Sequence, residues 1–342
     1  MGKLRMLLGT LLLAGTLSAL PAPANASGEP TTVDSVRLGT PESIRAYWTP
    51  ERMARAIPKD ILHGTAQGAP DQAVEAVGRE VTVAGAAPAR PPASSSIGSL
   101  AFFATPTVGK IFGVDSEGRD FRCSASAVPG PARNVIATAG HCVHDGPGLG
   151  WARQMIYMPY YNNQPDPWYG SWTVAWMHVY KGWSQEGKYS YDYAFASVLP
   201  RGDGAVLGDV TGFNGMSFNR NTSYSGSLWG YPAIPPSEGG WQYNCSDTVM
   251  VTFGLDPRVD DCPQIAQHGA SGGPWMYDYR NDRMWGHVTT VTSRGHIGET
   301  VFGPFFGDSA KRLWEIAGER GANQAEALSS PGARKWCRWA CG

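Results

Sequence analysis

The sequence predicts an all-β fold built from many short strands. Glycine occurs 43 times, proline 26 times, and only 17% of the 342 residues are charged, a composition typical of chains rich in turns. From residue 107 onward, short runs of β-branched and aromatic residues alternate with turn-forming residues. Since 42% of the residues are hydrophobic, a substantial core can form. A β-sandwich or a pair of β-barrels fits this spacing.

Residues 1–26 predict a secretory signal peptide. Basic residues precede the apolar run 6–20, and small residues at 24–26 allow cleavage before Ser27. The alternative is a membrane anchor, but the run is shorter than the roughly 20 residues that span a bilayer. We therefore expect a secreted, extracellular protein with no membrane contact after the signal is removed.

Residues 27–95 are interpreted as a propeptide and linker, here called the leader. Residues 41–57 include Tyr47, Trp48 and Met53, enough apolar surface for a short helix that could dock elsewhere. Residues 86–96 are rich in Ala, Pro, Arg and Ser and predict a linker. A disordered spacer is the alternative, although spacers seldom contain such aromatic residues.

Residues 96–326 are predicted to form the main domain. A helix can begin at Asp308 or Ser309, which can cap it, and end at Gly321. Residues 327–342 form a cysteine-containing tail that we expect to pack on the domain. The expected strands cover residues 108–114, 121–128, 135–139, 172–179, 193–199, 227–231, 249–253, 275–279, 283–292 and 301–306.

Six cysteines follow the signal peptide, an even number in a chain bound for an oxidising compartment, which predicts three disulfides. Spacing alone does not assign the partners, although sequential pairing would close three local loops. A zinc site is the alternative, but no Cys-x-x-Cys pair occurs and we expect no metal or other cofactor. The cysteines are Cys123, Cys142, Cys245, Cys262, Cys337 and Cys341.

Ser271 is the candidate nucleophile. It lies in a Gly-Ala-Ser-Gly-Gly-Pro run, and glycines allow the tight turn that exposes a hydroxyl beside free backbone N–H groups. Such a run could also be an ordinary glycine-rich turn, so the interpretation requires a base. His141 fits, because it ends an apolar strand and precedes Cys142. Its imidazole titrates near neutral pH and can accept and return a proton.

Asp192 is the candidate for the third member of a catalytic triad. A carboxylate that orients an imidazole is expected in apolar surroundings, and Asp192 begins the apolar run 193–199. A merely solvated charge is less expected there. The other aspartates considered lie in turn-like sequence.

These three motifs occur in the order His, Asp, Ser and resemble those of the trypsin-like serine proteases, over about residues 107–321. The chain looks most similar to secreted bacterial members related to glutamyl endopeptidases. The resemblance implies two packed six-stranded antiparallel β-barrels with a C-terminal helix, and an active site in the cleft between them. It also implies a secreted serine endopeptidase that cleaves peptide bonds through an acyl-enzyme.

The same resemblance implies further roles. The backbone N–H groups of Gly269 and Ser271 would form the oxyanion hole. Cys123 would pair with Cys142 beside His141. The residues expected to border the substrate are Ile265, His268, His287, and either Thr289 or Thr290, one of which could also support Asp192.

Two departures qualify the resemblance. Ala270 occupies the place of the aspartate that pairs with a new N-terminus in many relatives, so we expect leader removal to unblock the cleft instead. Ile265 stands where trypsin has an aspartate, which disfavours Arg or Lys at the cleaved position. The nearby histidines and threonines make Glu a candidate.

Two other functions are alternatives. An esterase would use Gly-x-Ser-x-Gly with His287 or His296 as base, but the strand after the serine and the lack of βαβ alternation argue against it. A catalytically silent binding protein is the second. The net charge of -1 without a basic run argues against nucleic acid. We expect a monomer that acts on proteins or peptides.

Overall fold

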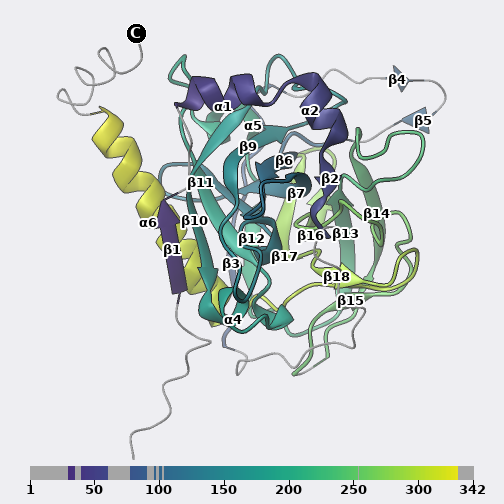
Figure 1. Cartoon of the computed structure of the whole chain (residues 1–342). Coiled ribbons are helices and arrows are strands. Elements are labelled where there is room, and N and C mark those ends of the chain that lie inside the picture. The colour runs from purple at the N-terminus through teal and green to yellow at the C-terminus, as the bar shows by residue number, and fades with distance from the viewer. Residues whose placement is uncertain are drawn as a thin grey trace, which may run out of the picture.

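The computed structural model describes residues 30–34, 40–60, 78–90, 96–97, 100–101, 104–252 and 254–329. The signal peptide, Cys337 and Cys341 lie outside these residues. Within the described part, the chain forms two β-sheet units and a long C-terminal helix (Figure 1). This architecture confirms the all-β expectation. No helix in these segments is both long and apolar enough to cross a membrane.

The first unit is a closed antiparallel barrel. Its strands follow the order β10-β11-β8-β7-β6-β9, and β9 pairs with β10 to close the sheet. Nearly every residue of these strands is buried, so the interior forms one continuous apolar core. The strands are β6 (Val108–Val114), β7 (Asp120–Val128), β8 (Val135–Thr138), β9 (Arg153–Pro159), β10 (Trp172–Tyr180) and β11 (Ala194–Val198).

The second unit contains a six-stranded sheet in the order β14-β13-β16-β17-β12-β3 and a three-stranded sheet in the order β15-β19-β18. The strands of the larger sheet are β3 (Val81–Val83), β12 (Gly215–Phe218), β13 (Tyr224–Gly230), β14 (Tyr243–Val249), β16 (Pro274–Arg280) and β17 (Trp285–Val291). Those of the smaller sheet are β15 (Arg258–Val259), β18 (Arg294–Gly295) and β19 (Val301–Phe302). The chain also contains two short helices, α4 (Lys181–Ser184) and α5 (Leu207–Thr211), and a hairpin formed by β4 (Ser96–Ile97) and β5 (Leu100–Ala101).

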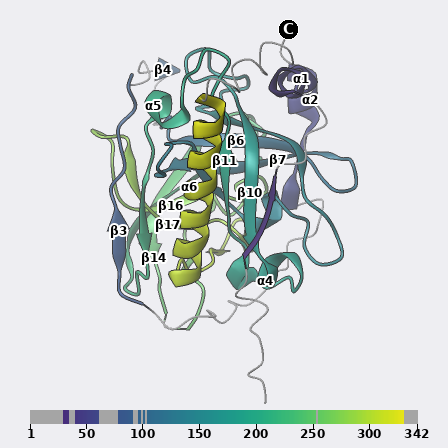
Figure 2. The ribbon, with the colours of Figure 1, turned by 90° about the vertical axis from the view of Figure 1, so that its left-hand side faces the viewer.

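The C-terminal helix α6 (Asp308–Ser329) lies across β10 and β11 (Figure 2). Ala310, Leu313 and Ala317 are completely buried, and their spacing gives the helix one apolar face. The helix runs past the predicted end at Gly321. A Cβ at that position would lie 2.5 Å from Asn134 Oδ1, so this glycine allows close packing on the barrel and does not end the helix.

The leader is docked on both units. Strand β1 (Pro30–Asp34) pairs with β10, β2 (Ile57–Pro58) pairs with β7, and β3 pairs with β12. Helices α1 (Pro41–Tyr47) and α2 (Pro50–Arg55) cover one end of the barrel in Figure 1. The single helix expected over residues 41–57 is divided because Pro50 disfavours helical geometry in the residue before it.

Candidate active site

Ser271 lies in a tight turn that precedes β16. Gly269 and Gly272 on either side adopt φ values of +90° and +80°, which L side chains rarely adopt. A Cβ at Gly272 would also lie 2.2 Å from Thr138 Oγ1 of the first barrel. The glycines of the motif are therefore required by the backbone path and by its close approach to β8.

Ser124 of β7 attaches this turn to the first barrel. Its backbone N–H donates to the carbonyl of Ser271 at 2.8 Å, and its hydroxyl donates to the carbonyl of Gly269 at 2.9 Å. The carbonyl of Ser124 in turn accepts from Thr138 Oγ1 at 2.8 Å. These contacts fix the candidate nucleophile relative to the unit that carries the candidate base.

His141 lies in the 3-10 turn Gly140–Cys142 that follows β8. A disulfide joins Cys142 to Cys123 of β7 and so fastens this turn to the barrel. The backbone N–H of His141 donates to Asp192 Oδ1 at 2.7 Å, and its Nδ1 bonds Asp192 Oδ2 at 2.8 Å. The two bonds to one carboxylate fix the orientation of the imidazole ring.

Asp192 is fully buried between the 3-10 turn Tyr189–Tyr191 and β11. Its Oδ2 also accepts a hydrogen bond from Ser293 Oγ at 2.6 Å. This is the supporting contact that the sequence analysis assigned to Thr289 or Thr290. Thr290 instead donates to the carbonyl of Pro304 at 2.6 Å. Ser293 lies two residues after the end of β17, and nothing in the sequence distinguishes it from other serines.

The charge of Asp192 affects the acidity of His141. Burial disfavours the imidazolium, but the attraction and hydrogen bond of Asp192 outweigh burial, so the pKa of His141 is raised above its ordinary value. His141 Nε2 is buried and has no hydrogen-bond partner within the described residues. This nitrogen is the free position at which a proton could be accepted. In unliganded sites such bonds are often absent until substrate binds.

A small hollow lies beside Ser271. Its volume is about 20 Å³, which is room for about one water molecule. The predicted residue Ile265 lines it, and so does Asp60 of the leader, which the sequence analysis did not identify. His287, Thr289 and Thr290 are not among its lining residues. Residues that line it also include Ala266, Gln267, Thr292, Arg294 and Val301.

His268 is not among the residues that line the hollow, but it contacts the leader residue Asp60, which is. Its Nδ1 bonds Asp60 Oδ2 at 2.7 Å, and the backbone N–H of Gly269 donates to Asp60 Oδ1 at 3.3 Å. The hydrogen bond from Asp60 raises the pKa of His268. His287 lies elsewhere, on β17 against Trp285, and burial lowers its pKa.

Arg294 is the cation in the wall of the hollow. Its side chain is buried and pairs with the buried carboxylate of Asp256 at 2.9 Å through Nη2. The other terminal nitrogen, Nη1, is buried without a hydrogen-bond partner in the described part of the chain. A buried donor without a partner is costly. The guanidinium also packs over the rings of Tyr189 and Phe302.

Two of the predicted disulfides are present, Cys123–Cys142 and Cys245–Cys262. The third expected pair lies outside the described residues. Cys123, His141 and Cys142 come close enough together to suggest a metal site. Because the two sulfurs are joined in a disulfide, however, they are not thiolate ligands.

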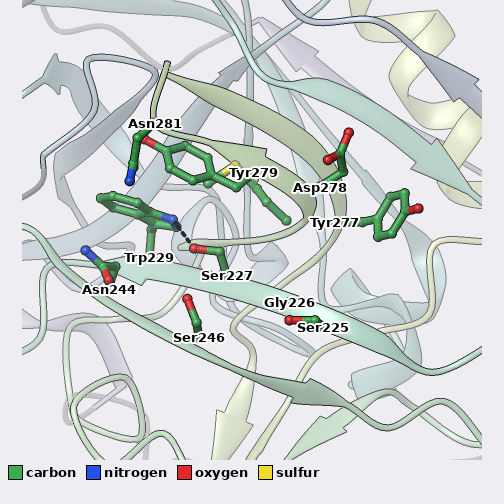
Figure 3. Close-up of a pocket in the computed structure, with 11 residues that line it drawn as sticks. Ser225, Gly226, Ser227, Trp229, Asn244, Ser246, Tyr277, Asp278, Tyr279 and Asn281 are labelled. Atoms are coloured by element: carbon green, nitrogen blue, oxygen red, sulfur yellow. Dashed lines mark hydrogen bonds between the residues drawn. The ribbon is translucent and has the colours of Figure 1, made fainter. Parts of the chain in front are cut away.

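A larger hollow of about 440 Å³ lies on the second sheet, over β13, β14 and β16 (Figure 3). Trp229 and Tyr279 pack at one end of it, and Trp229 Nε1 donates to Ser227 Oγ at 2.8 Å. None of the described residues that line this hollow is a histidine, so its serines have no neighbouring imidazole to act as a base. The candidate catalytic residues are therefore those around Ser271.

The chain is similar to several known proteases. A solved structure of the thermostable serine protease AL20 from an extremophilic microorganism is 30% identical, with a TM-score of 0.57, and the match covers 63% of this chain and 98% of AL20. The protease Anisep from Arthrobacter nicotinovorans is also 30% identical with a TM-score of 0.57, covering 63% of this chain and 97% of Anisep. Glutamyl endopeptidase from Bacillus licheniformis is 26% identical over 142 residues, 41% of each chain. The chain thus spans less than half the length of that curated relative. No family model matches.

The two β-sheet units and the hydrogen-bonded pair of His141 and Asp192 are typical of a serine protease. The similarity to AL20 extends over nearly all of that protein. The chain belongs to the trypsin-like serine proteases, and its class of enzyme is serine endopeptidase.

Proposed function

We propose that Ser271 is the nucleophile of peptide-bond hydrolysis, with His141 as general base and Asp192 as the group that orients it. Ser271 Oγ attacks the scissile carbonyl carbon while His141 Nε2 accepts its proton. The same proton passes to the leaving amine, which leaves an acyl-enzyme. Water then attacks the ester, with His141 again acting as base, and releases the acid and free Ser271.

The backbone N–H groups of Gly269 and Ser271 would bind the carbonyl oxygen as its negative charge develops. The observation that carries the proposal is the buried hydrogen-bonded pair of His141 and Asp192, with Ser271 fixed on the same barrel through Ser124. Buried carboxylates that orient an imidazole favour its cationic form during proton transfer.

A fluorophosphonate probe tests this mechanism, because it labels serines that are activated as nucleophiles. We expect labelling of Ser271, located by peptide mass spectrometry, and its loss in Ser271→Ala and in His141→Ala. His287→Ala and Ser225→Ala are matched controls away from the site and should label normally. If protein freed of its leader does not label, the site is not catalytic, and a silent binding protein becomes the better hypothesis.

We also propose that the protein is secreted as a monomeric precursor, with residues 1–26 as signal peptide, 27–95 as leader and 96–326 as the protease domain. The leader's contact with residues beside Ser271 supports a zymogen. Mass spectrometry of protein from the culture medium should find the sequence beginning after residue 95. Light scattering should give the mass of one chain.

For the residue that precedes the cleaved bond, we propose that Arg and Lys are disfavoured and that an acidic residue is accepted. Among the described residues after 95, none that lines the hollow carries a carboxylate. Arg294 lines the hollow and its Nη1 has no partner among the described residues, so it is a potential donor to an acidic side chain. His268, which bonds the carboxylate of Asp60, becomes a second potential donor once the leader is removed. The similarity to a protein named glutamyl endopeptidase supports the same choice. A fluorogenic peptide panel should give a higher kcat/KM for Glu or Asp than for Phe, Leu or Arg, and equal values would remove this part of the proposal.

A further inference from the structure

We propose that His268 and the backbone N–H of Gly269 form a carboxylate-binding site beside Ser271, and that Asp60 of the leader fills it and keeps the precursor inactive. The inference rests on the proposed catalytic role of Ser271. Each oxygen of Asp60 has its own partner, Oδ2 at His268 Nδ1 (2.7 Å) and Oδ1 at the Gly269 N–H (3.3 Å). The side chain of Asp60 is only 5% exposed, so its charge requires these partners.

The position of this carboxylate explains the inhibition. The Gly269 N–H that bonds Asp60 is one of the two donors proposed for the oxyanion of the substrate. A leader carboxylate and a substrate carbonyl oxygen cannot both use that donor in one complex. Asp60 and Ser271 also line the same hollow, which in this state has room for about one water molecule. A substrate side chain therefore has no space while Asp60 is in place.

The residues before Asp60 fix it there. Ile57 and Pro58 pair in parallel with Phe121 and Arg122 of β7, so the leader reaches the site as an added strand. The guanidinium of Arg122 also donates to the carbonyl of Ala56 at 2.5 Å. The strand pairing does not depend on side-chain recognition, and it sets the register of the leader on the barrel.

Lys59 provides a second anchor. Its ammonium is fully buried and lies 2.5 Å from Asp145 Oδ1 and 3.8 Å from Asp115 Oδ2. Burial lowers the pKa of Lys59, and the two carboxylates counteract that effect by favouring its charged form. Because Lys59 is held beneath the barrel surface, the adjacent Asp60 is directed to His268. The carboxylate site is thus specific for an acidic residue in this register.

The raised pKa of His268 agrees with a charged imidazole beside Asp60. Asp60 also contributes, after Asp192, to the raised pKa of His141. The charge of Asp60 therefore favours the protonated form of His141, which cannot act as a base, although the neighbouring charge of Lys59 opposes this effect. Blocking of the oxyanion donor and protonation of the base would act together in the precursor.

The test compares fluorophosphonate labelling rates of the full-length, uncleaved protein, resolved by size from any processed product. Asp60→Asn keeps the shape of the side chain but removes its charge, and we expect its precursor band to label at least about tenfold faster than wild type. Glu51→Gln is the matched control, because it removes a solvent-exposed carboxylate of the same leader. It should label at the wild-type rate.

His268→Gln provides a second, independent variant. It should also accelerate labelling, and the double variant Asp60→Asn with His268→Gln should gain little more than either single change, because both remove one contact. The inference fails if Asp60→Asn labels at the wild-type rate or more slowly. A slower rate would mean that Asp60 serves the working enzyme. If even leader-free protein does not label, the proposed function fails instead.

Discussion

Three donors surround the carboxylate of Asp192: the backbone N–H and Nδ1 of His141 and the hydroxyl of Ser293. All three belong to buried groups, so the carboxylate is fixed without water. A hydrogen bond to a charged group contributes about 1.5–3 kcal/mol. The orientation of the imidazole therefore depends on a residue of the second unit as well as on its own barrel.

Ser293→Ala should lower kcat about 10- to 100-fold, with a smaller effect on KM, because it removes a donor from Asp192, although Ser293 also lines the hollow beside Ser271. Thr290→Val is the matched control, since Thr290 bonds the carbonyl of Pro304 instead. That control should lower stability without lowering kcat. Steady-state kinetics of both variants gives kcat and KM, and thermal unfolding gives their stability. A Ser293→Ala enzyme with unchanged kcat would exclude the positioning role.

The pH dependence of kcat/KM follows from the raised pKa of His141. His141 must be neutral to accept the serine proton, so activity is lost as the pH falls through its pKa. Because Asp192 raises that pKa, the acidic limb of the profile should lie above pH 6.5 in leader-free enzyme. A pH–rate profile with a fluorogenic peptide measures it. An acidic limb well below that value would contradict the proposed pairing.

At the level of single residues, sequence alone identified the groups whose chemistry is local. The glycines around Ser271 and the cysteine after His141 mark a tight turn and a fastened loop, and both are visible in a few adjacent letters. Ser293 and Asp60 were not identified, because their roles depend on contacts with residues about 100 and 208 positions away. Such distant pairs leave no pattern in one sequence.

At the level of elements, the end of helix α6 also depends on a contact between residues that are distant in the sequence. Gly321 was interpreted as a stop signal, whereas its lack of a side chain lets the helix approach Asn134. Strands β9, β12 and β14 were also not predicted, although the expected strands over residues 108–114 and 121–128 match β6 and β7 closely. The missed strands include polar positions, so their apolar periodicity is weak.

Gly321→Ala should destabilise the protein by about 1–3 kcal/mol, although alanine normally favours a helix. The added methyl group would meet Asn134 Oδ1 at 2.5 Å. Asn323→Ala, at an exposed position of the same helix, should be neutral or slightly stabilising. Urea unfolding gives both values. A stabilised Gly321→Ala protein would mean that the helix can move away from the barrel.

The two disulfides allow a matched comparison. They separate their cysteines by 19 and 17 positions, so replacing either pair with alanine should cost about 3 kcal/mol by the chain-entropy argument. Only loss of Cys123–Cys142 should also slow fluorophosphonate labelling of leader-free enzyme, because that bond fastens the His141 turn. Equal labelling rates of both variants would show that the Cys123–Cys142 disulfide does not contribute to catalysis.

At the scale of the whole molecule, burial of apolar side chains helps to bind the leader. Trp48 is 2% exposed, packs against Phe112, and donates through Nε1 to the carbonyl of Gln154 at 2.7 Å. The sequence predicted that this segment could dock, from its aromatic residues. It did not predict where, because the partner surface forms only when β6 and β9 come together.

Trp48→Ala should cost about 3–5 kcal/mol of the interaction between the leader and the barrel. Hydrogen exchange of the full-length variant should then show faster exchange at residues 41–58, while β6 and β7 stay protected. Ile57→Ala, an exposed apolar leader residue, is the control and should change exchange little. Unchanged protection of residues 41–58 in Trp48→Ala would contradict the role assigned to this contact.

The leader adds β1 and β2 to the first unit and β3 to the second, yet it is one segment that leaves the ribosome before either unit. Each unit can therefore complete its sheet on a strand that has already been made, which reduces the search for distant strand pairing. After the leader is removed, its three strands are no longer available to guide strand pairing. The mature enzyme would then persist because its unfolding is slow, and once unfolded it would regain its structure poorly without a leader supplied to it.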